Sequence, residues 1–367
     1  MHPFTLSNLA RLIQQLLVGT LLCMSVAACA GGNPTVAMTQ GATPSFLRST
    51  TQIGSAAIAD AHNGCSSYSG ERLYVADYTE QGHFDILAFK ASAHQNTLPL
   101  CTISYSDLPK TGGMVDDASG KLWVMDSETI SLMAFPHAAN GSNPPVQAIS
   151  GSNTLLVGSE AAGYQGIAVD QTGNVWVPCW YDYNNPYGYL VAFANDASGN
   201  VAPVATVGFG DKGVGEHIAS PLAVTFDHEG NLYVAEFNPV VVVFTPPFTD
   251  TSRPVATWNL PHQDTAQYLS VDSHDNVYVG GQGSIDIFKG GLKSKGVLWR
   301  HIPTPRANGF YDVKVDNENH IDAAMVAGYN GINAVGVLRP HASSFDNARY
   351  ITSPPMRSPP GTLALGL

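Results

Sequence analysis

The chain has 367 residues, of which 44% are hydrophobic and 13% are charged. Its 29 acidic side chains outnumber the 17 lysines and arginines, giving a formal net charge of −12, which argues against nucleic acid or anionic lipid as the main partner. The 36 glycines and 24 prolines, with little helical periodicity, argue against a helical protein and favour a large domain of strands and turns.

Residues 1–28 have the features of a bacterial export signal. Arg11 is their only charged side chain, and the apolar stretch from Leu16 to Val26 is short for a membrane span. The segment ends Val26-Ala27-Ala28-Cys29, and small residues before a cysteine resemble a lipoprotein processing site. The resemblance implies cleavage before Cys29 and lipid attachment to it, which would anchor the protein to a membrane surface.

Two alternatives to this processing stay open. Cys23 is a weaker competitor because bulky Leu21 and Leu22 precede it, and ordinary signal cleavage before an incidental cysteine also fits. No Asp follows Cys29, which by the rules of the lipoprotein family favours the outer membrane. Residues 29–52 are rich in small and polar residues with one charge, Arg48, and are expected to form a flexible tether.

A sequence phrase recurs through the remainder of the chain: apolar residues, an Asp, a polar turn and then a strand with an aromatic residue. One copy is Gly166–Asp170 followed by Gly173–Val177, and another is Ala223–Asp227 followed by Gly230–Val234. The aligned positions are 44 to 57 residues apart and fall at Tyr74, Trp123, Trp176, Tyr233, Tyr278 and the degenerate Asp322. This period is typical of four-stranded blades, so the sequence predicts an all-β, six-bladed β-propeller over residues 53–353.

Each repeat is expected to hold four antiparallel strands, A to D from the centre outward. In the third repeat they are Gly166–Asp170, Asn174–Cys179, Tyr189–Phe193 and Val204–Phe209. The A–B turns carry recurring aspartates that we expect to cap the turns, since one catalytic site needs only one copy. These are Asp117, Asp170, Asp227, Asp272 and Asp316.

The ends of the propeller are less regular. Tyr350–Thr352 is a candidate outer strand of the sixth repeat, and a strand near Phe46–Ile53 is an alternative for closing the ring. Residues 354–367 are expected to form a loose C-terminal tail.

The phrases Leu73–Asp77 and Leu232–Glu236, with third strands that end in Phe, make residues 60–352 similar to NHL-repeat and related six-bladed propellers. The resemblance implies the fold and leaves the ligand open. Cys65 and Cys101 are the favoured disulfide pair because both lie in the first repeat of an exported chain. The alignment puts them on an inner and an outer strand, which are not neighbours, so the bridge stays open; Cys179 would remain free.

Ligands of such folds usually sit at one mouth of the central channel, close to the residues before strand A and after strand B. The candidates before strand A are Asn63, Gln165, Gln267 and Tyr311, and those after strand B are Asp77, Asp126, Trp180 and Glu236. The loop Trp180–Tyr187 adds Tyr181 and Tyr183, whose rings suit stacking on a sugar or peptide. The acids are equally explained as caps of local N–H groups, and the loop by packing on its own blade.

Six-bladed lactonases resembling gluconolactonase bind a divalent cation just before strand A. Here Gly112, Leu222 and Tyr311 supply no carboxylate there, so neither a metal nor another cofactor is predicted. An acid–base pair from Glu216, His217 or His262 is a further hypothesis, and solvated loop residues are the simpler interpretation.

The sequence therefore favours a propeller of the bacterial cell envelope, lipid-anchored and expected in the outer membrane, that acts as a binding or scaffold module. The expected partners are an envelope protein, peptide or glycan, and the membrane through Cys29, but no nucleic acid. The alternatives are a lactonase-like hydrolase or a lyase of the virginiamycin B type at the channel mouth, and a purely structural envelope protein.

Overall fold

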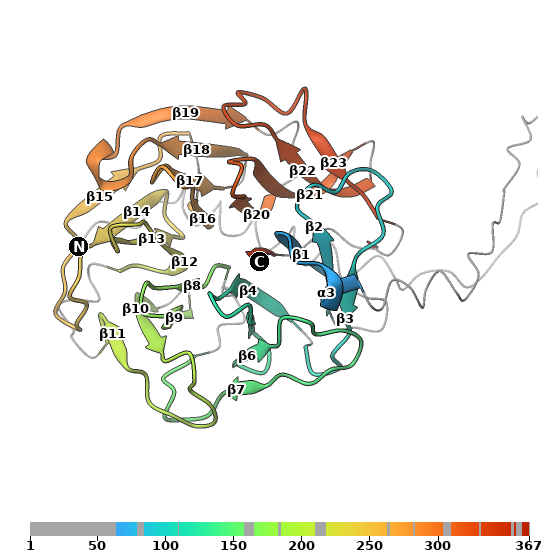
Figure 1. Cartoon of the computed structure of the whole chain (residues 1–367). Coiled ribbons are helices and arrows are strands. Elements are labelled where there is room, and N and C mark those ends of the chain that lie inside the picture. Colours follow the sequence, from blue (N-terminus) through green and yellow to red (C-terminus); the bar gives the residue numbers. More distant parts are fainter. Residues whose placement is uncertain are drawn as a thin grey trace, which may run out of the picture. The chain divides into compact units, whose positions relative to one another are not determined.

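Six four-stranded antiparallel sheets form a ring (Figure 1), which confirms the predicted six-bladed β-propeller. The described residues all belong to one compact unit, Ile53–Leu367. The structure is a computed structural model that describes residues 64–78, 84–108, 110–157, 165–182, 185–209, 218–262, 265–281, 283–303, 310–329, 332–353, 356 and 362–366. None of the helices in these ranges is long and apolar enough to cross a membrane.

Blades two to six each consist of four consecutive strands, with the innermost first. The second blade contains β4 (Thr111–Asp116), β5 (Leu122–Asp126), β6 (Ser131–Phe135) and β7 (Gln147–Ile149). The third contains β8 (Ala168–Val169), β9 (Val175–Asp182), β10 (Asn185–Phe193) and β11 (Ala205–Val207). The fourth contains β12 (Pro221–Phe226), β13 (Leu232–Glu236), β14 (Val240–Phe244) and β15 (Ala256–Asn259).

The last two blades follow the same order. The fifth contains β16 (Tyr268–Val271), β17 (Val277–Gly280), β18 (Ser284–Phe288) and β19 (Leu298–Pro303), with the 3₁₀ turn η1 (Gly291–Ser294) before β19. The sixth contains β20 (Phe310–Val315), β21 (Ile321–Tyr329), β22 (Ile332–Leu338) and β23 (Arg349–Ile351). β23 confirms the outer strand predicted near Tyr350.

The first blade is assembled from both ends of the propeller. Its strands, from the centre outward, are β24 (Leu363–Gly366), β1 (Arg72–Tyr78), β2 (Phe84–Lys90) and β3 (Cys101–Ile103). β24 pairs antiparallel with β1, and the Leu363 N–H donates to Asp312 Oδ2 of the sixth blade (2.9 Å). The prediction of a loose tail is therefore wrong for Leu363–Gly366, because the inner edge of β1 needs backbone partners that only these residues supply. The alternative strand at 46–53 lies outside the described residues.

The recurring aspartates cap the A–B turns, as predicted. Asp227 Oδ1 accepts the N–H groups of Glu229 (3.0 Å) and Asn231 (2.9 Å), and its Oδ2 accepts the Tyr233 hydroxyl (2.7 Å). The same two backbone bonds recur at Asp117, Asp170, Asp272 and Asp316. In blades two to five the blade aromatic, six residues on, bonds to the second oxygen. Each aspartate thus holds its turn to its own second strand.

Cys65 and Cys101 form a disulfide, which decides the pairing left open by the sequence. Cys65 lies on the short helix α3 (Gly64–Ser67), not on an inner strand, so the repeat alignment was wrong at this point. β24 takes the place of the inner strand and leaves α3 to pack beside β3. Cys179 is buried and free.

Neighbouring blades are joined at their outer edges in two ways. Gly141 of the second blade exchanges backbone hydrogen bonds with Thr102 (2.7 Å) and Ser104 (2.8 Å) beside β3, and Gly199 of the third blade donates to Ala148 (2.7 Å) in β7. Between blades five and six the Arg300 side chain donates instead to the Ala342 carbonyl (3.1 Å). This side-chain link leaves a hollow beside it, described below.

Candidate functional site

The predicted mouth residues fall into three groups. Asn63, Tyr183, Glu216, His217 and the anchor residue Cys29 lie outside the described residues. Tyr181 and Tyr311 belong to β9 and β20, but their side chains are not described. The structure shows the environment of the remaining candidates, which are Asp77, Asp126, Gln165, Trp180, Glu236 and Gln267.

The three acids after strand B are buried. Asp126 Oδ1 accepts the N–H groups of Glu128 and Thr129, each at 2.8 Å, so it caps the local turn. Glu236 accepts the Ala219 N–H (2.9 Å), and burial raises its pKa to about 8. Asp77 lies in β1 opposite Asp85. The carboxyl groups of Asp126 and Glu236 therefore accept backbone N–H groups of the propeller, and the local-cap interpretation is confirmed for Asp126.

Trp180 is packed and not presented to solvent. It is 3% exposed, and its ring centroid lies 5.7 Å from that of Phe237 in the next blade. Counted from the blade aromatic Trp176, the equivalent of Glu236 is Cys179 and not Trp180. Burial of Cys179 raises the pKa of its thiol to about 12. Among the described residues of the loop, Tyr187 is the exposed aromatic, at 48%.

Gln165, Glu236 and Gln267 lie on an arc over blades three to five. The Gln165 N–H donates to the Leu222 carbonyl (3.0 Å), and its buried Oε1 accepts no hydrogen bond from a described residue. The Ala266 N–H, next to Gln267, donates to the Glu236 carbonyl (3.2 Å). The backbone thus brings part of the predicted set to neighbouring positions, but the described residues include no group of three acids, histidines or cysteines that could hold a metal.

An acid–histidine pair lies between strands β18 and β19. Asp286 is fully buried and lies 2.7 Å from Nδ1 of His301, whose ring centroid is 4.5 Å from that of His262. A buried carboxylate fixes the orientation of an imidazole in this way. In the described part of the chain, His301 makes no side-chain hydrogen bond besides the one to Asp286. The predicted role of His262 in acid–base chemistry therefore lacks a described nucleophile.

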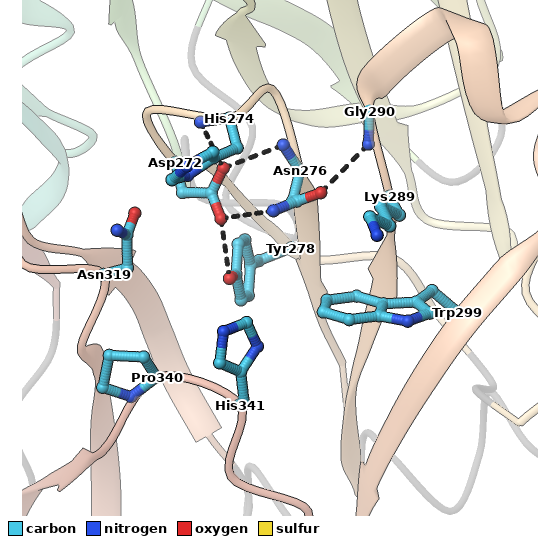
Figure 2. Close-up of a pocket in the computed structure, with 10 residues that line it drawn as sticks. All are labelled: Asp272, His274, Asn276, Tyr278, Lys289, Gly290, Trp299, Asn319, Pro340 and His341. Atoms are coloured by element: carbon cyan, nitrogen blue, oxygen red, sulfur yellow. Dashed lines mark hydrogen bonds between the residues drawn. The ribbon is translucent and has the colours of Figure 1, made fainter.

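A pocket of 410 Å³ lies at the opposite end of the blades, between blades five and six. In each antiparallel blade the A–B turn and the C–D link share one end, away from the mouth loops. Figure 2 shows the residues that line the pocket from these turns and links, which are Asp272, His274, Asn276, Tyr278, Lys289, Gly290, Trp299, Asn319, Pro340 and His341. Its volume is in the lower range of small-molecule sites.

Trp299 reaches this pocket because of a β-bulge. Ile287 pairs with Arg300 while the next residue, Phe288, pairs with Leu298, so Trp299 is the extra residue of β19. A bulge turns a side chain away from the regular alternation of its strand. Trp299 is 38% exposed, with Lys289 Nζ at 5.3 Å and the Arg300 guanidinium at 4.3 Å from its ring centroid.

One wall of the pocket is already fully hydrogen-bonded (Figure 2). Asp272 Oδ1 accepts the N–H groups of His274 and Asn276, and its Oδ2 accepts the Asn276 amide (2.7 Å) and the Tyr278 hydroxyl (2.9 Å). Asn276 Oδ1 in turn accepts the Gly290 N–H (3.0 Å). Burial, and then the charge of Asp272, raise the pKa of Tyr278, which keeps its hydroxyl a donor. This wall is a rigid support with little left to bind a ligand.

The opposite groups remain available to a ligand. Among the described residues, Lys289 and His341 contact only the Trp299 ring through their side chains. His274 Nδ1 lies 3.3 Å from Ser273 Oγ, and the Asn319 amide oxygen accepts from the same hydroxyl (3.2 Å). Nε2 of His274 and the amide nitrogen of Asn319 are then left to bind other groups.

Sequence reasoning missed this pocket because it searched the mouth face. The signal was Trp299 in an outer strand, but Trp258 occupies the preceding outer strand and is buried. Trp258 is covered by Phe288 of the next blade, with ring centroids 5.0 Å apart, whereas the bulge in β19 turns Trp299 toward the pocket, and neither arrangement follows from a single sequence.

No model of a protein family matches the sequence, and no curated protein is similar to it. Solved structures share the fold. A chain of a nidogen/laminin complex has a TM-score of 0.54 and 14% identity over 81% of this chain and 99% of that chain. A protein of unknown function from Bacteroides caccae has a TM-score of 0.56 and 8% identity over 81% of this chain and 99% of that one.

A virginiamycin B lyase from Staphylococcus aureus is more distant, with a TM-score of 0.45 and 12% identity over 69% of this chain and 73% of that chain. At these identities the likeness concerns the fold alone. The protein is therefore a six-bladed β-propeller, and the narrower NHL-repeat assignment stays a prediction. Its function has to be argued from its own residues.

Proposed function

We propose that the protein is a binding module of the bacterial cell envelope, anchored by lipid on Cys29, that takes a ring-shaped ligand in the pocket between blades five and six. The observation that carries this proposal is Trp299, which a bulge presents to a pocket whose other free groups are polar. An aromatic ring beside a few uncommitted donors is the usual composition of a small-ligand site.

Binding is favoured over catalysis because the described acidic side chains near the blade ends already accept hydrogen bonds within the protein. The repeated aspartates cap the A–B turns, and Asp126 and Glu236 accept backbone N–H groups. The Asp286–His301 pair would orient a base, but a hydrolase also needs a nucleophile or an activated water that this base can reach. A binding role requires only the pocket groups that are present.

Export is supported by two features of the chain. The N-terminal segment has the pattern of a lipoprotein signal, and the Cys65–Cys101 disulfide is of a kind that persists in oxidising compartments. A lipid anchor with a following tether would hold the propeller at the membrane surface while leaving both of its faces accessible.

The anchor is tested with Cys29→Ser and, as the matched control, Cys23→Ser. In a bacterial host supplied with labelled fatty acid, Cys29→Ser should lose the label and move from the membrane pellet to the soluble fraction. Cys23→Ser should keep both properties. Retention of label and pellet association by Cys29→Ser would refute lipid attachment at this residue.

The pocket is tested by saturation-transfer NMR against a defined set of neutral and acidic oligosaccharides and tripeptides. At least one compound should receive saturation from the wild type, and Trp299→Ala should abolish the signal. Tyr187→Ala, on the mouth side, is the control and should retain it. Loss in Tyr187→Ala alone would move the site to the mouth, and absence of any signal would refute the pocket as a ligand site.

A further inference from the structure

We infer that the pocket beside Trp299 recognises an acidic saccharide, that is, a pyranose ring that carries a carboxylate. This inference rests on the proposed function and narrows its ligand. It depends on the charge that the pocket leaves uncompensated, on the aromatic ring, and on the kind of hydrogen-bonding groups that remain unused.

The charge that the pocket lining exposes to solvent is that of Lys289. Asp272 is the one carboxylate among the lining residues, and four hydrogen bonds from the turn and from Tyr278 already surround it. Lys289 is exposed and has no ion pair with a described residue. Arg300 adds a second cation behind Trp299 and is held there by the Ala342 carbonyl. An incoming anion would therefore meet Lys289 without competition from an exposed carboxylate of the lining residues.

The free hydrogen-bonding groups suit a sugar. The His341 ring and the amide nitrogen of Asn319 offer donors around the rim, which match hydroxyl and carboxylate oxygens. Because Ser273 donates to Asn319, His274 Nδ1 donates to Ser273, and Nε2 of the neutral ring is left as an acceptor for a sugar hydroxyl. Trp299 supplies an apolar face or edge against which the C–H groups of a pyranose can pack. A bare anion such as phosphate would leave this ring uncovered, and a flat aromatic acid would leave the rim donors without acceptors.

The charge of the whole protein limits the size of the ligand. With a net charge of −12, the molecule repels a long polyanion, and the attraction from Lys289 acts over a short distance only. A single acidic residue at the end of a short glycan fits this combination better than an extended acidic polysaccharide.

The test is isothermal titration of the mature propeller with two matched pairs, glucuronate with glucose and sialyllactose with lactose. At least one acidic member should bind with Kd of about 1 mM or tighter, and its neutral counterpart at least about tenfold more weakly. Inorganic phosphate and indole acetate, as a free anion and an aromatic acid, should bind more weakly than that acidic sugar.

Two lysine variants make the test specific. Lys289→Gln should weaken the binding of the acidic sugar by about tenfold, because a charged hydrogen bond is lost, and should leave the affinity for the neutral sugar unchanged. Lys293→Gln removes a fully exposed lysine that pairs with Glu229 outside the pocket, and should change neither. Trp299→Ala should weaken the binding of both sugars of a pair.

The outcomes separate the inference from the proposed function. Neutral sugars that bind as well as acidic ones would overturn the inference that the ligand is acidic, and so would an unchanged affinity of Lys289→Gln for the acidic sugar. Either result would keep the pocket as a binding site. Tighter binding of phosphate or indole acetate would also overturn the inference. Failure of every probe at about 10 mM, with folded protein, would overturn the inference and, together with a negative NMR screen, the proposed function.

Discussion

Closure of the ring by the last strand makes a sharp prediction for Leu363→Ala. Leu363 is fully buried, and it packs in the cluster between blades six and one with Leu73, Val75 and Val335. Removing a buried leucine side chain costs about 2–5 kcal/mol, from lost burial and from the cavity that remains. We therefore expect the free energy of unfolding to fall by about 3 kcal/mol, a large share of the stability of an ordinary domain.

The measurement is urea unfolding followed by tryptophan fluorescence and circular dichroism, with Leu98→Ala as the matched control. Leu98 is 45% exposed, so the same substitution there should change the free energy by less than about 0.5 kcal/mol. Equal midpoints for the two variants would mean that β24 is not packed, and would refute closure by the C-terminal strand.

Three further predictions concern buried groups. Burial, and then the nearby Asp316 charge, raise the pKa of Asp322 well above its usual value, and neither of its carboxylate oxygens accepts a hydrogen bond from a described residue. The contribution of Asp322 to stability is therefore fully present below the unfolded pKa and is lost as pH rises through the folded pKa. Relative to the wild type, the free energy of unfolding of Asp322→Asn should be at least about 1 kcal/mol higher at pH 8 than at pH 4, as measured by urea unfolding at both pH values. An equal difference from wild type at both pH values would contradict this. The paired substitution Cys65→Ala with Cys101→Ala should cost about 2–4 kcal/mol more in oxidised protein than in protein kept reduced, as measured by thermal unfolding in each condition. Tyr233→Phe, which removes the hydroxyl bonded to Asp227 Oδ2, should cost about 1–2 kcal/mol, whereas Tyr105→Phe, which removes an exposed hydrogen bond to Asp107, should cost less than about 0.5 kcal/mol in the same assay.

The repeat pattern was sufficient for the blades because each blade is a local unit. The Asp of the A–B turn, the glycine after it and the aromatic strand lie within about ten residues, so their spacing carries the geometry of a hairpin. Gly173 and Gly230 adopt positive φ (86° and 81°) at these turns, which other residues rarely do. The count of six blades follows from the same pattern, including the degenerate one, since Asp322 still lies in a second strand, β21.

The mouth candidates show where local reasoning stopped. Asp126 and Glu236 were placed correctly at the ends of second strands, but whether a carboxylate there faces a ligand or a backbone N–H depends on neighbouring segments. Trp180 is predicted among the ligand candidates at the mouth, but it is buried against Phe237 of the next blade. Burial between blades depends on two segments that are distant in the sequence, so the sequence of either segment alone does not predict it.

Sequence by itself thus determined the class of fold, the number and order of the blades, and the structural role of the repeated aspartates, because these depend on contacts between near neighbours in the chain. Tertiary structure alone decided that Leu363–Gly366 completes the first blade, that Cys65 meets Cys101, and that Trp299 faces a pocket beside Lys289. The first two join segments that are far apart in the sequence, and the pocket needs residues of blade six, such as His341, beside those of blade five. The short strand, the small helix and the bulge that create these contacts are specified by their surroundings rather than by their own residues.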